Sequence, residues 1–581
     1  MDAKTRQVLA KGESFIREAS EPSRFVQKGE ARGTWQALII LIDFPDYRWN
    51  HRDDLNFFNE DTLYVPAHYE QMLFSLKTFK HPYSQHGYTG SMRDFYLENS
   101  YGRFEVTGVV TRWYTASNPR SFYANGKAGF GAYPNSSRKL VEEAVLLADD
   151  DVDYSQFDNN ADGRVDALFV VHAGPGAEEI YTENFPEHDN YLWSHKASIQ
   201  TRVLDDVAVS EYTLEPENGS IGVFCHEFGH ALGLPDLYDT DGSSEGIGEW
   251  GLMGGGGWCH REGDPLGTSP AHFTAWSKSR LGWLEPTTVN ANLMQVDIPP
   301  VELQPVAFRL WTDGQIGREY FLIENRQNIG FDVGLTRRQK DFGLADAHGL
   351  IVYHVDYFGR QNDERRRFID VEEASPYDSL GQPIEQLDLK RVLPKHEFLS
   401  NGNRGDNGDP FPGFSQLNQL GTDFLGNRDL TEFNASTSPN SNDNDGNPTP
   451  VAMANIKEIG VKIMADLFVS PVTSADHQPV AVVSETPGQF VLGQNFPNPF
   501  NPDTQIEFSI LGNYRTPIIL GIYNLKGKLV RTLVNEKMSP GTHTALWDGT
   551  DKFGQKVASG IYIYKLICQS QSQTRQMILL R

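Results

Sequence analysis

One stretch of the sequence, residues 220–236, governs how the rest of the chain is interpreted, and it reads SIGVFCHEFGHALGLPD. Its apolar residues recur at helical spacing, so residues 220–232 are predicted to form a helix with one buried face. Ser220 suits the N-cap of that helix. Gly233 can adopt the left-handed conformation that ends it.

The polar residues of this stretch have the spacing of metal ligands. His226 and His230 are four residues apart, so both imidazoles lie on the same face of the helix. The turn at Gly233 can bring Asp236 back as a third ligand, and Glu227 can contact a metal-bound water without being a ligand. Two imidazoles, one carboxylate and an open fourth position are typical of catalytic zinc. Such a zinc lowers the pKa of its water from about 16 to about 7, which supplies a nucleophile at neutral pH.

Further along, the sequence GLMGGGG at residues 251–257 predicts a tight turn. Met253 is predicted to lie beneath the metal ligands as an apolar floor, and an ordinary core methionine is the alternative. The chain has three cysteines, which are too few for a disulfide framework. Cys225 and Cys259 flank the predicted site, either as a disulfide or as two buried free thiols.

A second cation site is predicted in the sequence DNNADGRVD at residues 158–166. Oxygen-bearing groups at alternating positions around a glycine turn suit Ca²⁺, although a complete EF-hand loop would have glutamate where this chain has Phe169. The alternative is an Asx-rich turn, which is also our interpretation of the acidic loops at 406–409 and 443–445. The predicted calcium ligands are Asp158, Asn160, Asp162, the carbonyl of Arg164, and Asp166.

Composition argues against several other classes of protein. Lys and Arg number 51 and Asp and Glu number 77, so the net charge of −26 disfavours nucleic acid and anionic membranes as partners. No apolar run approaches the roughly 20 residues of a membrane-spanning helix. His195 and His354 lie in strand-like runs and are interpreted as structural residues.

At 581 residues the chain is expected to be multidomain. Strand-like and helix-like segments alternate over residues 31–285, which predicts an α/β (α+β) domain. Residues 286–470 contain short strand-like runs and long turns, which predict a β-rich, sandwich-like second domain. A polar linker is predicted at 471–487, followed by a small Ig-like β-sandwich at 488–581. Residues 1–30 are interpreted as an N-terminal propeptide remnant.

The extended zinc motif and Met253 together resemble the metzincin clan. The surrounding residues resemble the immune inhibitor A family of bacterial secreted metalloproteases over roughly residues 31–470. The matching segments keep the family's order: LIDFPD at 41–46, NSYG at 99–102, HEFGHALGLPDLY at 226–238, EYFLIEN at 319–325 and GLIVYHVD at 349–356.

This resemblance implies a metzincin-like fold and a secreted zinc endopeptidase that cleaves proteins. It implies zinc ligation by His226, His230 and Asp236, with Glu227 as the general base. Many metzincins place a tyrosine two residues after the turn methionine to stabilise the oxyanion. Here that position is Gly255, so His260 and Tyr238 are the candidates for this role.

The end of the chain resembles the C-terminal sorting domain of proteins exported by the type IX (Por) secretion system. The resemblance rests on QNFPNPFNP at 494–502, WDGTD at 547–551 and SGIYIY at 559–564. It implies a secreted or surface-attached protein, the type IX machinery as a partner, and an N-terminal signal that residues 1–30 do not show. The residues alone indicate only a small sandwich, which could equally bind carbohydrate or pack on the protease.

Two other functions are open at this point. One is a surface adhesin or binding protein on an inactive protease scaffold, and the other is a zinc amidase acting on small molecules. Glu227 and the complete ligand set favour a peptidase over a binding protein, because binding alone would not need them. The accessory domains and the family resemblance favour protein substrates over small ones.

Overall fold

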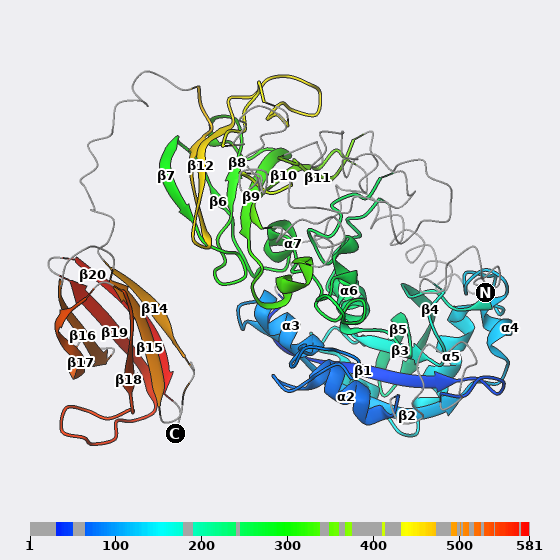
Figure 1. The fold of residues 1–581 in the computed structure, drawn as a ribbon. Coiled ribbons are helices and arrows are strands. Elements are labelled where there is room, and N and C mark those ends of the chain that lie inside the picture. The colour runs from blue at the N-terminus through cyan, green and yellow to red at the C-terminus, as the bar shows by residue number, and fades with distance from the viewer. Residues whose placement is uncertain are drawn as a thin grey trace. The chain divides into compact units, whose positions relative to one another are not determined.

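The structure is a computed structural model, and its fold is drawn in Figure 1. The chain divides into two compact units, residues 1–472 and 473–581. The structure describes residues 31–49, 64–177, 190–239, 244–336, 348–359, 366–374, 409–412, 431–437, 439–471, 490–496, 500, 503–510, 516–524, 528–539, 541–568 and 571–579.

The first unit contains a five-stranded sheet whose strands β1, β2, β3 and β5 are parallel. Strand β4 pairs antiparallel with β5 and forms one edge. From Ala37 onward both faces of β1 are buried, which explains the continuous apolar sequence there. In the order β2-β1-β3-β5-β4, the strands are Phe104–Thr115, Gly33–Asp43, Leu168–His172, Val207–Pro216 and His195–Leu204.

Helices cover both faces of this sheet. One face packs on a core that includes residues of α2 (Pro66–Phe74), α3 (Met92–Asn99), α6 (Ile221–Ala231) and α7 (Ala275–Arg280). The other face packs on α4 (Arg120–Ala124) and α5 (Ser137–Ala148). The helix predicted at 220–232 is therefore confirmed as α6. Short 3₁₀ turns lie at η2 (Tyr154–Phe157), η4 (Gly255–Trp258), η5 (Thr312–Gly314) and η6 (Gly330–Thr336).

Two further sheets follow α7 in the sequence. The five-stranded sheet has the order β11-β10-β9-β8-β6, and the three-stranded sheet has the order β12-β13-β7. Their strands are β6 (Thr287–Thr288), β7 (Leu293–Ile298), β8 (Phe308–Leu310), β9 (Glu319–Arg326), β10 (Gly349–Asp356), β11 (Ile369–Val371), β12 (Ala452–Ile459) and β13 (Lys462–Phe468).

The five-stranded sheet of β6 and β8–β11 contributes to two cores. Phe321 and Ile323 of β9 pack in the core that includes residues of β12 and β13. Tyr320 and Leu322, on the opposite face of the same strand, pack in the core that contains α6 and α7. Figure 1 shows α6 between the β1–β5 sheet and the sheet of β8–β10. The boundary predicted at 285/286 therefore falls within one compact unit, and the division into two domains stays a prediction.

The second unit is an antiparallel sandwich of two sheets, with the orders β14-β15-β18 and β17-β16-β19-β20. Trp547 of β18 and Tyr564 of β19 are among the buried side chains that both sheets direct into one core. The strands are β14 (Phe490–Phe496), β15 (Thr504–Ile510), β16 (Thr516–Asn524), β17 (Leu529–Met538), β18 (Gly541–Trp547), β19 (Gly560–Cys568) and β20 (Gln571–Leu579).

Within the described residues, no helix combines the length and the apolar composition that crossing a membrane requires.

Candidate metal centre

The helix α6 carries the central motif and ends as its sequence predicts. Gly233 has a φ of 89°, so the chain leaves the helix in the left-handed conformation that glycine favours. Its N–H donates to the carbonyl of His230 at 2.9 Å. Ser220 occupies the N-cap, but its hydroxyl does not cap the helix and instead donates to the carbonyl of Leu266. The turn at Gly233 redirects the chain so that Asp236 faces the helix.

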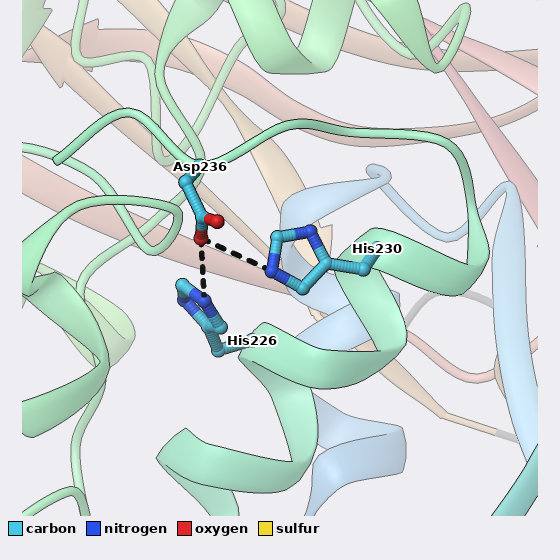
Figure 2. Close-up of side chains that lie close together, drawn as sticks. All are labelled: His226, His230 and Asp236. Atoms are coloured by element: carbon cyan, nitrogen blue, oxygen red, sulfur yellow. Dashed lines mark ion pairs between the residues drawn. The ribbon is translucent and has the colours of Figure 1, made fainter. Parts of the chain in front are cut away.

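The three predicted zinc ligands lie together. Figure 2 shows the imidazoles of His226 and His230 and the carboxylate of Asp236 pointing toward a common point. Asp236 Oδ1 lies 3.2 Å from Nε2 of His226 and 3.1 Å from Nε2 of His230. Among the residues that the structure describes, this is the one group of three His, Cys, Asp or Glu ligand atoms within 4.8 Å of one another.

Backbone carbonyls orient both imidazoles through their other nitrogen. His226 Nδ1 lies 2.9 Å from the carbonyl oxygen of Leu252, and His230 Nδ1 lies 2.8 Å from that of Leu234. A proton on each Nδ1 satisfies the carbonyl and leaves the Nε2 lone pair directed toward Asp236. Metal-binding histidines commonly have such a partner on the second nitrogen, because it fixes the tautomer and the ring orientation.

This donor set fits zinc. Ligands about 2.0 to 2.1 Å from a tetrahedral ion lie roughly 3.3 Å from one another, close to the distances between Asp236 and the two imidazoles. Asp236 Oδ1 is buried, and the groups that face it are the two imidazole Nε2 atoms. A carboxylate oxygen withdrawn from water requires a cationic partner, which a metal ion or protonated imidazoles can provide.

The electrostatics of the site follow from burial and close opposite charges. Burial lowers the pKa of His226, but hydrogen bonding to Asp236 and the charge of Glu227 raise it to about 9. Burial raises the pKa of Asp236, and the two imidazoles outweigh this effect and hold it well below its usual range. Burial also raises the pKa of Glu227, against the opposing effect of His230 and His226. Glu227 is 7% exposed, and its Oε2 has no hydrogen-bond partner in the described structure.

Met253 lies against α6 at the point where the helix has no side chain. A Cβ atom on Gly229 would lie 2.6 Å from the Met253 sulfur, so a side chain there would require Met253 to move. The carbonyl of Met253 accepts a hydrogen bond from the N–H of Leu237 at 2.8 Å, which ties the turn to the residue after Asp236. The turn after Met253 also approaches α6 at Gly222, where a Cβ would lie 1.9 Å from the carbonyl oxygen of Gly257.

Of the two candidates for oxyanion stabilisation, Tyr238 lies beside the ligands. Its ring stacks on that of His226, with centroids 6.2 Å apart and an interplanar angle of 19°. Burial, together with Asp236 and Glu227, raises the pKa of Tyr238, so its hydroxyl keeps its proton at neutral pH. His260 is buried, with Nδ1 2.9 Å from the carbonyl of Trp258.

The structure also describes the cysteines, the two strand histidines and part of the acidic loops. Cys225 and Cys259 are buried free thiols, not a disulfide. His354 is buried and His195 is half-buried, and both have hydrogen-bond partners, in agreement with a structural interpretation. The loop at 443–445 is a turn in which Asp443 accepts backbone N–H groups, and residues 406–408 lie outside the described residues.

The predicted calcium loop does not form a ligand group like that of the zinc site. The Asp158 carboxylate accepts the backbone N–H groups of Asp162 at 3.0 Å and Gly163 at 2.9 Å. Asp166 accepts the backbone N–H of Asn159 and the side-chain amide of Asn160. These contacts are typical of an Asx-rich turn, and calcium binding stays a prediction.

Sequence reasoning missed the groups that hold the imidazoles. The carbonyls of Leu252 and Leu234 act through the backbone, so no residue type indicates them. Lys196 of β4 was also missed: its Nζ donates to the carbonyl of His230 at 3.1 Å and pairs with Glu211 at 3.0 Å. A lysine beside His195 in an edge strand was the only available signal, and it does not indicate a helix terminus as the partner.

Residues 23–284 match the sequence profile described as the Immune inhibitor A peptidase M6, catalytic domain. This region is similar to a known metalloprotease domain. Residues 517–571 match the FlgD Ig-like domain, within the C-terminal sandwich. The first match contains α6, Asp236 and Met253, and it ends before the sheet of β6 and β8–β11.

Two curated relatives carry related names. Pre-pro-metalloprotease PrtV of Vibrio cholerae serotype O1 is 33% identical over 281 residues, covering 43% of this chain and 30% of that protein. Immune inhibitor A of Bacillus thuringiensis subsp. alesti is 32% identical over 276 residues, covering 42% of this chain and 39% of that protein. The chain thus spans less than half the length of either relative. Among solved structures, dimeric latent PorU from Porphyromonas gingivalis covers 22% of this chain and 12% of its own at 17% identity, with a TM-score of 0.15. The profile and the curated relatives support an immune inhibitor A-like metalloprotease.

Proposed function

We propose that this protein is a secreted zinc endopeptidase that hydrolyses peptide bonds of extracellular proteins. The observation that carries the proposal is the convergence of two imidazole Nε2 atoms on Asp236 Oδ1, with both Nδ1 atoms directed at backbone carbonyls. His226, His230 and Asp236 would hold the metal. Further support comes from the match of residues 23–284 to a peptidase catalytic domain.

In this mechanism Glu227 moves the proton. A bound zinc ion supplies Lewis acidity, which polarises a carbonyl and lowers the pKa of water to about 7. Glu227 accepts a proton at its unpartnered Oε2 as the oxygen of the attacking water bonds to the carbonyl carbon. The carboxyl then gives that proton to the amide nitrogen as the C–N bond breaks. Burial of Glu227 raises its pKa, which brings it nearer to the operating pH of a general base.

The test is digestion of a mixed peptide library with and without a zinc chelator. We expect cleavage of internal peptide bonds, loss of activity with chelator and recovery with added zinc. Glu227→Gln should lose turnover yet retain about one zinc ion per chain, whereas Asp236→Ala should lose the zinc. Substantial turnover by Glu227→Gln would contradict the role of Glu227. A zinc-loaded wild type that cleaves nothing would favour a binding protein on a protease scaffold.

We further propose that residues 488–581 form a sorting domain that directs the protein through a type IX secretion system to the medium or the cell surface. Its resemblance to such domains is the reason, and the match of residues 517–571 to the FlgD Ig-like domain supports only the sandwich fold.

We also propose that residues 158–166 bind calcium. Burial raises the pKa of Asp166 to about 6, and the charges of Asp162 and Asp158 add to this effect. A cation at this loop would relieve that repulsion between carboxylates.

A further inference from the structure

Strand β9 carries two charged side chains into the interior of the first unit. Glu324 and Arg326 are both fully buried. Because side chains alternate along a strand, these residues share the face of Tyr320 and Leu322, which pack in the core of α6 and α7. Strand β9 lies beyond the end of the peptidase-domain match at residue 284. A buried guanidinium is costly unless its donors are paired, so the partners of Arg326 are informative.

Arg326 is paired on every side. Nε and Nη2 donate to the two carboxylate oxygens of Asp332, each at 2.8 Å. Nη1 donates to the backbone carbonyl of Trp250 at 2.9 Å and to Glu324 at 3.2 Å. The hydroxyl of Tyr353, from β10, donates to Glu324 at 2.7 Å and lies 3.3 Å from the same Trp250 carbonyl. The sheet of β6 and β8–β11, called the second sheet below, thus holds the carbonyl of Trp250, three residues before Met253.

A second arm from Arg326 reaches the same segment. Asp332 Oδ1 accepts the backbone N–H of His272 at 2.7 Å. The carbonyl of His272 in turn accepts the N–H of Leu252 at 3.1 Å. The two arms close a ring that runs from Arg326 through Trp250, Leu252, His272 and Asp332 back to Arg326. Both ends of the segment from Trp250 to Leu252 are therefore anchored.

The anchored segment is the one that orients a metal ligand. The carbonyl of Leu252 faces His226 Nδ1 at 2.9 Å. Gly251, between the two anchors, has no space for a side chain, because a Cβ would lie 2.6 Å from Cγ2 of Thr274. A shift of the Trp250 carbonyl would therefore be transmitted to the Leu252 carbonyl and the imidazole of His226.

We propose that Arg326 is a positioning residue of the metal centre, acting through Trp250 and Leu252 on the imidazole of His226. The inference rests on the proposed zinc site. It makes the second sheet part of the machinery that binds the metal. Groups that hydrogen-bond a metal ligand directly typically change metal affinity or activity by about 10-fold to 100-fold when they are removed, and Arg326 acts through such a group.

The test measures zinc affinity by competition with a chelator, and kcat and KM at saturating zinc. Arg326→Met has a similar volume but no donors, and it should weaken zinc binding about 10-fold or more. KM should change little, because Arg326 does not contact substrate. Tyr353→Phe keeps Arg326 and removes only the hydroxyl that donates to Glu324 and lies near the Trp250 carbonyl, so it should show a smaller loss in the same direction.

The matched control is His354→Gln. His354 neighbours Tyr353 on β10 and is buried between carboxylates, but it packs on Phe321 at the other face of the sheet. This variant should be destabilised while keeping wild-type zinc affinity and kcat.

The outcomes separate the inference from the proposed function. Zinc affinity and kcat unchanged in folded Arg326→Met would overturn the inference alone. If that variant does not fold, Tyr353→Phe with zinc affinity equal to the control would overturn it. A wild type that binds no zinc would overturn both the inference and the proposed function.

Discussion

At the scale of single residues, each imidazole of the candidate metal centre is oriented by a backbone carbonyl. His226 and His230 both direct Nδ1 at a backbone carbonyl, and their ring planes are perpendicular. Tyr238 adds a hydroxyl-bearing ring stacked on His226. The position two residues after Met253 is Gly255, which has no side chain to stabilise an oxyanion. Tyr238 is therefore the residue that we expect to do so.

Tyr238→Phe should lower kcat by about 100-fold, because a preorganised hydroxyl donor to the developing oxyanion is lost. Zinc content and KM should stay near wild type, since the ring and the three ligands are retained. Steady-state kinetics together with metal analysis check this outcome. Tyr133→Phe is the control, because Tyr133 is exposed and its hydroxyl donates to Glu142 instead. Equal kcat values for the two variants would remove Tyr238 from the mechanism.

At the scale of elements, β10 carries an ion-paired histidine in its buried interior. His354 Nε2 lies 2.9 Å from Glu319, and Nδ1 lies 3.3 Å from Glu372. Burial lowers the pKa of His354, but the two carboxylates outweigh this effect and raise the pKa to about 9. Burial also raises the pKa of Glu372. His354 and Glu372 therefore both favour the protonated form.

This arrangement predicts a pH-dependent stability. The folded pKa of His354 lies above its unfolded value of 6.5, so the stabilisation is complete below pH 6.5 and is lost as pH rises through about 9. The loss should be about 2 to 3 kcal/mol across that range. Urea unfolding of the wild type and of His354→Gln, at about pH 6.5 and about pH 9, measures this loss of stability. Burial lowers the pKa of Lys278 to about 8. Lys278 titrates in the wild type and in the variant, so its contribution cancels from the difference in stability between them. A stability difference that stays constant with pH would contradict the prediction.

The loop at 158–166 is the second element with a testable role. If it binds calcium, added calcium should raise the melting temperature, because a ligand that binds only the folded state stabilises it by mass action. Asp162→Ala should remove most of that increase. Asp443→Ala is the control, since Asp443 organises a turn through backbone N–H groups. Melting curves that do not respond to calcium would leave the loop as a plain turn.

At the scale of the whole molecule, the first unit extends well beyond the peptidase-domain match. Tyr320, Leu322 and Tyr353 of the second sheet pack in the same core as Phe228 of α6 and Met253. The fully buried Arg326 links that sheet to the carbonyl of Trp250. Removing the sheet would expose apolar surface and leave buried charges without partners.

Truncation tests this organisation. A chain ending at residue 472 should fold, retain zinc and cleave protein with a kcat near that of the full chain, because it contains the whole first unit. A chain ending at residue 285 should be insoluble or lack zinc, since it lacks β9 and β10. Residues 488–581 should fold alone as a sandwich. Wild-type activity in the chain ending at 285 would show that the second sheet is dispensable.

The same truncation addresses the sorting domain. In a host with the type IX machinery, and with a suitable leader, the chain ending at 472 should accumulate in the periplasm while the full chain is exported. Normal export of the truncated chain would contradict the role proposed for residues 488–581.

The convergence of His226, His230 and Asp236 could be predicted from sequence because their arrangement is local. His226 and His230 are one helical turn apart, and Gly233 reverses the chain within a few residues of Asp236. The helical periodicity of α6 likewise depends on neighbouring residues, and this helix forms where expected. Zinc binding by these three residues, the general base, the domain boundaries and the calcium loop stay predictions.

Contacts between residues far apart in the chain were decided only by the tertiary structure. The pairing of Arg326 with the carbonyl of Trp250 joins residues 76 positions apart, and the pairing of His226 with the carbonyl of Leu252 joins residues 26 positions apart. Backbone carbonyls are the same at every residue, so no sequence pattern indicates which one accepts a given donor. Two buried free thiols at Cys225 and Cys259 were also undetermined by sequence, because a disulfide depends on geometry that spacing does not reveal.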